Sequence, residues 1–176
     1  MDQPPISTLP DYAELQCMSH YSFLHGASPP DQLVARAAQL GYQAVAMADE
    51  CSLAGVVKAH VAAREWNIHL IIGSQMRVTP EDGTPPFTVL VLAMDRDGYG
   101  NLSELITAAR TRADKGSYLV WPRDIANPTA PLAHLKGLPG CQLILCPKNN
   151  APYEDCLLYT SPSPRDQRGS RMPSSA

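Results

Sequence analysis

Short apolar runs alternate with amphipathic segments along the middle of the chain, and this alternation limits the possible folds more than any other feature. Apolar runs at 12–18, 44–48 and 69–72 have the length and composition of strands. The segments 29–40 and 53–66, which lie between them, carry apolar residues at helical spacing. Strands that alternate with helices are typical of parallel βαβ units. The sequence therefore predicts an α/β fold with parallel strands and surrounding helices.

Capping residues indicate where these helices begin and end. We expect Ser28 to cap the first helix, with Pro29 at its first position and Gly41 after its last turn. Ser52 or Asp49 is expected to cap the second helix. Such caps satisfy backbone N–H groups that the first turn of a helix leaves unpaired, which supports both helix assignments.

The pattern then changes to a hairpin, a third helix and a last strand. Residues 76–78 and 87–92 flank a Pro/Gly-rich turn at 79–86, so these two runs are expected to be neighbours in the sheet. Residues 98–115 have helical periodicity, and 141–146 form a final apolar run that reads as a strand.

Charge and composition exclude several classes of protein. A formal net charge of −3 excludes a free-standing basic nucleic-acid binder, because such a protein must neutralise many phosphates. No apolar run approaches the roughly 18–20 residues that a membrane span needs, and residues 1–5 show no secretory signal. Five cysteines without close paired spacing fit reduced thiols. We therefore expect a cytoplasmic location and no membrane contact.

The two ends of the chain differ from its middle. Residues 1–10 carry three prolines and no periodicity, so we expect a flexible leader before a partial domain at 11–155. Residues 156–176 are rich in Ser, Pro and Arg and are expected to be disordered. Residues 156–161 also match the translation of a transposon end that is used in sequencing libraries. We expect this tail to be adapter-derived; a natural disordered tail is the alternative.

Polar residues cluster where the first three strands are expected to end. Ligands of parallel α/β folds bind at the carboxyl ends of the strands, and the segments 16–20, 49–52 and 73–75 occupy those positions. The sequence thus predicts a cleft whose candidate residues are Gln16, Met18, Asp49, Glu50 and Gln75, with His20 close enough to reach it.

Four segments in this order resemble the polymerase-and-histidinol-phosphatase (PHP) domain that begins the alpha subunit of bacterial C-family DNA polymerases. The segments are 14–28, 49–55, 71–75 and 98–102. The variant with Gln16 most resembles the error-prone members that act in damage-induced mutagenesis. The resemblance implies a distorted (β/α) barrel, of which this chain is a fragment with an exposed sheet edge.

The same resemblance shows where this sequence departs from the family. Metal-binding members have His at the positions of Gln16 and Met18, Asp-His at Asp49 and Glu50, and Glu at Gln75. Only Asp49 matches in this chain. Zinc and manganese prefer imidazole and carboxylate ligands, whereas Gln and Met are poor substitutes. We therefore expect a degenerate cleft with no metal, no cofactor and no catalytic residue within the chain.

The resemblance also implies the activity of the intact protein. That protein would be a DNA-directed DNA polymerase that extends a primer-template with deoxynucleotides, using Mg²⁺ held by carboxylates beyond residue 155. Other mutagenesis proteins and the sliding clamp are its expected partners. Two alternatives stay open: an active metal-dependent phosphoesterase or 3′–5′ proofreading exonuclease, and a non-enzymatic interaction module.

Two further clusters have competing interpretations. Asp49 and Glu50 could form a general acid/base pair or serve as helix caps and dipole partners. A basic stretch near Trp121 could contact DNA or form a solvated helix face. Its members are Arg110, Arg112, Lys115 and Arg123.

Overall fold

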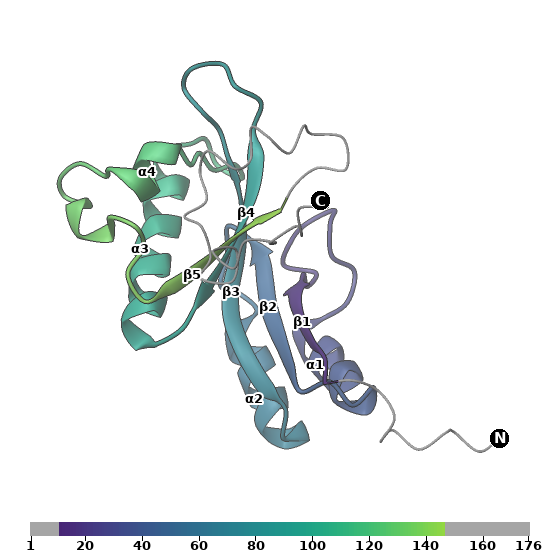
Figure 1. The fold of residues 1–176 in the computed structure, drawn as a ribbon. Helices are drawn as coiled ribbons and strands as arrows, with labels where there is room; N and C mark the ends of the chain where they lie inside the picture. Colours follow the sequence, from purple (N-terminus) through teal and green to yellow (C-terminus); the bar gives the residue numbers. More distant parts are fainter. Residues whose placement is uncertain (1–10, 147–176) are drawn as a thin grey trace, which may run out of the picture. The chain divides into compact units, whose positions relative to one another are not determined.

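Five strands form one sheet in the order β1-β2-β3-β4-β5 in the computed structural model, which describes residues 11–146 (Figure 1). The strands are β1 (Ala13–Cys17), β2 (Ala44–Glu50), β3 (His69–Val78), β4 (Phe87–Ala93) and β5 (Cys141–Cys146). Strands β1, β2 and β3 are parallel, whereas β3, β4 and β5 pair in antiparallel fashion. The predicted α/β class with parallel strands is confirmed, and the antiparallel half makes the sheet mixed.

The helices lie between these strands in the chain. They are α1 (Pro30–Gln39), α2 (Val56–Trp66), α3 (Arg96–Thr111) and α4 (Pro122–Ala126), followed by a single 3₁₀ turn at Ala133–Leu135. Among residues 11–146, no helix is both long enough and apolar enough to cross a membrane.

Strand β3 is longer than its apolar run predicts. The sequence places 73–75 after the strand, but the structure places them inside it, because β3 continues to Val78. Its second half pairs with β4 across the Pro/Gly-rich turn, with Met76 opposite Val89 and Val78 opposite Phe87. The hairpin is therefore as expected, whereas the end of the third strand is not where the sequence indicated.

None of the residues expected as N-caps, Ser28, Ser52 and Asp49, caps a helix. Helix α1 begins one residue later than predicted, with Pro29 as its N-cap and no side-chain cap. Helix α2 has Gly55 as its N-cap, so neither Ser52 nor Asp49 caps it. Ser52 Oγ instead accepts a hydrogen bond from Ala54 N–H ahead of the helix. Gly41 does follow α1 as predicted, with a φ of 77°.

Strand register assigns alternate side chains to two faces of the sheet. Residues that lie opposite each other on paired strands point to the same face. Val45 and Met47 face helices α1 and α2 in one buried cluster. Ala48 lies opposite Gly73 on the other face, where an apolar cluster also includes Leu92.

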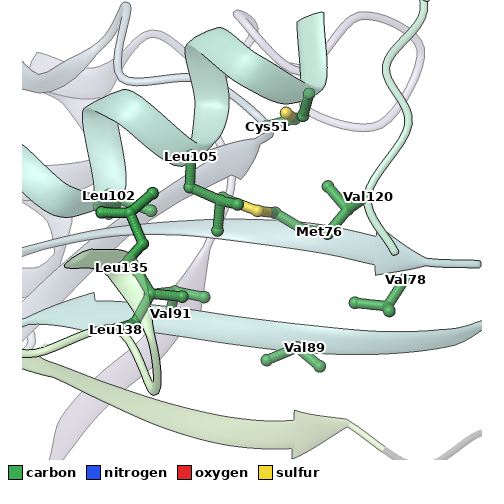
Figure 2. Packing of buried hydrophobic residues seen from close by; sticks show 11 residues of the cluster. Cys51, Met76, Val78, Val89, Val91, Leu102, Leu105, Val120, Leu135 and Leu138 are labelled. Carbon is green, nitrogen blue, oxygen red and sulfur yellow. The ribbon is translucent and has the colours of Figure 1, made fainter. Parts of the chain in front are cut away.

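Helix α3 covers the same face as α1 and α2, further along β3. Figure 2 shows Leu102 and Leu105 of this helix directed toward Met76 and Val91 of the sheet. Leu102 and Val91 are fully buried, and burial of a side chain of this size contributes about 2 kcal/mol. The other face of the sheet carries Glu50 and Gln75, which the next section describes.

Candidate functional site

Gln16 and Gln75 meet across strand β2. Gln16 lies on β1 and Gln75 on β3, and the strand between them places Glu50 opposite Gln75. Gln16 Nε2 donates a hydrogen bond to Gln75 Oε1. The structure thus brings together two of the predicted cleft residues from strands that are not neighbours in the sheet.

Glu50 lies next to this pair and has a partner on each carboxylate oxygen. Tyr118 Oη donates to Glu50 Oε1 over 2.8 Å, and His25 Nδ1 lies 2.7 Å from Glu50 Oε2. Tyr118 Oη in turn accepts from Arg77 N–H over 3.0 Å. Burial raises the pKa of the Tyr118 phenol well above its ordinary value of 10.0, so this hydroxyl remains a donor at neutral pH.

Sequence reasoning did not single out Tyr118 as a site residue and left His25 aside. Tyr118 is 68 residues from Glu50, in a segment without helical or strand periodicity. Its contact depends on how the chain after α3 folds back onto the sheet. No spacing rule could have indicated that contact.

Asp49 points to the opposite face from Glu50, because successive side chains of a strand alternate. Its side chain is buried, and it accepts three hydrogen bonds from the loop between β1 and α1. Ser19 N–H and Ser22 Oγ donate to Oδ1, each over 2.7 Å, and Ser19 Oγ donates to Oδ2 over 2.8 Å. Asp49 therefore anchors a loop. It does not cap α2, and it shares no face with the Gln16–Gln75 pair.

Met18 and His20 complete the predicted set. Met18 is half-buried at the end of β1, where its carbonyl approaches Gly26. His20 is exposed; its ring packs against Tyr21 at 4.5 Å between centroids, and its N–H donates to Ser28 O over 2.9 Å. His20 is thus a loop residue whose observed contacts are all within its own loop.

The donors present do not fit the metal ions of catalytic PHP domains. Within residues 11–146, no group of three or more His, Cys, Asp or Glu side chains could hold a metal ion. Asp49 accepts three hydrogen bonds from Ser19 and Ser22, and each carboxylate oxygen of Glu50 has one partner, Tyr118 or His25. Amide oxygens such as that of Gln75 are neutral and weak ligands. A metal ion here would compete with hydrogen bonds that the protein already makes.

The basic stretch near Trp121 makes structural contacts. Arg112 forms two hydrogen bonds with the Asp124 carboxylate, at 2.5 and 3.1 Å. The guanidinium groups of Arg112 and Arg123 lie 4.1 and 4.2 Å from the Trp121 ring centroid. Arg110 donates to two backbone carbonyls at the end of β2. Arg110 and Arg112 are therefore neither a solvated face nor free for phosphates.

The structure is thus an α/β domain with a mixed sheet, one face of which gathers Gln16, Glu50 and Gln75. The family described as "PHP domain" matches residues 14–138, and the chain belongs to this family. Its curated relatives include proteins named error-prone DNA polymerase. One from Bordetella parapertussis is 56% identical over 139 residues, which are 79% of this chain and 13% of the relative. One from Ralstonia nicotianae is 54% identical over the same shares.

The chain thus spans about 13% of the length of these relatives. Among solved structures, an amidohydrolase from Chromobacterium violaceum has a TM-score of 0.48 and 23% identity, over 56% of this chain and 33% of that one.

Proposed function

We propose that residues 11–146 belong to the PHP domain of an error-prone DNA polymerase and that this domain is a scaffold without metal chemistry of its own. The identity of 56% with a relative of that name supports the first part. The observation that supports the second part is that every oxygen of the two carboxylates in the predicted cleft, Asp49 and Glu50, already has a partner within the protein.

In this domain, hydrogen bonds link the ends of the strands to each other and to the neighbouring loops. In metal-binding PHP domains, a bound metal ion would have this role. The Gln16–Gln75 amide pair links β1 to β3. Glu50 joins the end of β2 to the loop before α1 through His25 and to the segment after α3 through Tyr118. Charge-assisted hydrogen bonds of this kind are stronger than neutral ones and fix geometry. The strand tips would therefore hold their arrangement without a divalent cation.

The polymerase chemistry belongs to the rest of the protein. In the proposed whole, a primer-template and deoxynucleotides are the substrates, and Mg²⁺ held by carboxylates outside this chain stabilises the transferring phosphoryl group. Other mutagenesis proteins and the sliding clamp are proposed partners, and the cytoplasm is the proposed location.

A chimera tests the polymerase assignment. Residues 11–146 would replace the matching segment of the Bordetella parapertussis polymerase, and primer extension would be measured on intact and damaged templates. We expect extension within a few-fold of the parent enzyme. A soluble, folded chimera without extension would refute the assignment. Extension that survives complete deletion of the segment would instead favour the non-enzymatic interaction module.

Metal titration tests the scaffold assignment. The 176-residue chain would be titrated with Zn²⁺ and Mn²⁺ by calorimetry and assayed on a phosphate monoester and on the 3′ end of DNA. We expect neither stoichiometric binding nor cleavage. Binding together with cleavage, both lost in Glu50→Gln, would establish the phosphoesterase or proofreading alternative.

A further inference from the structure

The five histidines of the chain differ in whether their side chains have partners. His25 and His134 each lie against a glutamate, and the His20 ring packs on a tyrosine. Within residues 11–146, the side chains of His60 and His69 make no hydrogen bond, ion pair or ring contact. Both of these imidazoles line the same hollow in the surface.

That hollow has a volume of about 560 Å³ and lies at the amino ends of β2 and β3. Its buried lining residues, Ala63 and Ile68, are apolar, whereas its exposed ones are polar. A strand rises about 3.3 Å per residue, so the hollow is about 20 Å along β2 from Glu50 and is separate from the candidate site. We call it the polar hollow, after its exposed residues Gln43, His60, Arg64, Asn67 and His69.

Helical spacing and strand register explain why these side chains meet. His60 and Arg64 are four residues apart on α2, and side chains at this spacing lie on the same face of a helix. His69 opens β3 two residues after the C-cap of α2 and lies opposite Ala44, the first residue of β2. Gln43 directly precedes that residue. The polar hollow is therefore built by a helix and two strands together.

The charge that lines the polar hollow has one sign. None of its lining residues is acidic, and the Arg64 guanidinium is permanently charged. Imidazole side chains accept protons near neutral pH and then donate from both ring nitrogens. Glu65 adjoins Arg64 in the sequence, but neighbours on a helix do not face each other, and within residues 11–146 the two form no ion pair. Donors of this kind suit an anion with several acceptor oxygens, such as phosphate.

The dipole of α2 accounts for Arg64 alone. A basic residue in the last turn of a helix interacts favourably with the C-terminal end of the dipole, and Arg64 occupies that turn. The effect falls off beyond the last turn, and His60 lies more than one turn before the end of α2 at Trp66. His69 lies on a strand. Stabilisation of the helix thus does not explain why all three groups gather around one hollow.

We propose that the polar hollow binds a phosphate group, with Arg64 as its main ligand and His60 and His69 as further hydrogen-bond donors. The C-terminal end of α2 carries partial negative charge, so an anion binds there only while the Arg64 guanidinium offsets it. One guanidinium and two imidazoles suffice for a single phosphate and are too few for a long tract of nucleic acid. The inference does not rest on the polymerase assignment.

Titration of the 176-residue chain with inorganic phosphate, followed by NMR, tests this site. We expect saturable shifts of the His60 and His69 ring signals, with a dissociation constant in the millimolar range. Sodium chloride at the same ionic strength should not produce them. Arg64→Gln should weaken phosphate binding at least about ten-fold, because it removes a charge-assisted hydrogen bond, and Arg64→Lys should recover part of the affinity.

Arg36→Gln is the matched control, because Arg36 occupies the last turn of α1 as Arg64 does in α2 but does not line the polar hollow. It should leave phosphate binding unchanged. The absence of saturable shifts, equal shifts with chloride, or equal losses in Arg36→Gln and Arg64→Gln would overturn the proposal.

Two further probes identify where the phosphate comes from. A deoxynucleoside monophosphate and a short single-stranded oligonucleotide would be titrated in the same way. Tighter binding of the oligonucleotide than of the monophosphate assigns the polar hollow to a phosphate of DNA. Equal or weaker binding of the oligonucleotide assigns it to a free phosphate or a mononucleotide.

Discussion

Ser22 Oγ donates a hydrogen bond to Asp49 Oδ1 over 2.7 Å and accepts one from the backbone N–H of the next strand residue over 2.9 Å. Both Ser22 and Asp49 are buried. The hydroxyl thus fastens the loop before α1 to the end of β2. The loop and the strand end are therefore expected to lose their order together.

Asp49→Ala should lower the free energy of unfolding by about 3 kcal/mol, because it leaves the buried donors of Ser19 and Ser22 without an acceptor. Urea unfolding followed by circular dichroism measures this change. Asp114→Ala removes an exposed carboxylate and is the matched control. A loss for Asp49→Ala no larger than that of the control would contradict the anchoring role.

Two glycines of α3 should respond to alanine in opposite directions. A Cβ on Gly98 would lie 1.9 Å from the Gly140 carbonyl oxygen, so Gly98→Ala should destabilise the fold by about 2 kcal/mol through overpacking. A Cβ on Gly100 meets nothing within 4 Å, so Gly100→Ala should stabilise it by about 1 kcal/mol through helix propensity. Thermal unfolding measures the change in stability for each variant. A change of the same sign for both would refute the close approach of α3 to the loop before β5.

The stability of the fold should decrease at alkaline pH in part through Cys51. Burial raises the pKa of this thiol from 9.0 to about 11, although Arg110 opposes the shift. Between these values the unfolded state has lost the proton that the folded state keeps, so the unfolding free energy falls as pH rises. The contribution of Cys51 is about 1 kcal/mol between about pH 8 and pH 10.

Urea unfolding at several pH values, for the wild type and Cys51→Ala, isolates that contribution. We expect a shallower decline for the variant. The loss of packing is the same at every pH and does not affect the slope. If the plots of unfolding free energy against pH are parallel for the two proteins, burial does not raise the pKa of the Cys51 thiol.

Arg112→Lys should lower the free energy of unfolding by about 1–2 kcal/mol, because an ammonium group cannot make the two-point contact with Asp124. The Arg112 side chain is 21% exposed and that of Asp124 is 8% exposed. Arg123→Lys changes an ion pair with Glu81 at 3.2 Å whose members are about half exposed, together with a contact to the Trp121 ring, and its effect should be smaller than that of Arg112→Lys. Chemical denaturation measures the free energy of unfolding of both variants. Equal losses would mean that burial does not strengthen the Arg112–Asp124 pair.

Periodicity predicted most of the fold, because it reports which side chains must be buried. The last strand has the predicted bounds, 141–146. The continuation of β3 through 73–75 was not predicted, because Gly73, Ser74 and Gln75 interrupt the apolar run. Their places in the strand are fixed by pairing with β2 and β4, and such pairing is invisible to a local pattern.

The sequence predicted only the part of the candidate site that depends on the pairing of neighbouring strands. The meeting of Gln16 with Gln75 follows from the parallel register, which places Gln75 opposite Glu50 at the end of β2. The roles of Asp49 and Glu50 were not separable from the sequence, because adjacent residues of a strand face opposite sides and nothing local says which side is covered. The partners of Glu50, His25 and Tyr118, come from loops whose paths no propensity determines.

The anchoring of Asp49 by two serines changes what its presence in a sequence means. An aspartate that accepts hydrogen bonds from a loop stabilises that loop whether or not a metal ion is bound. The presence of Asp49 in the sequence is therefore not by itself a sign of a retained metal site. The residue one place later, Glu50, lies on the other side of the strand and contacts Tyr118 and His25.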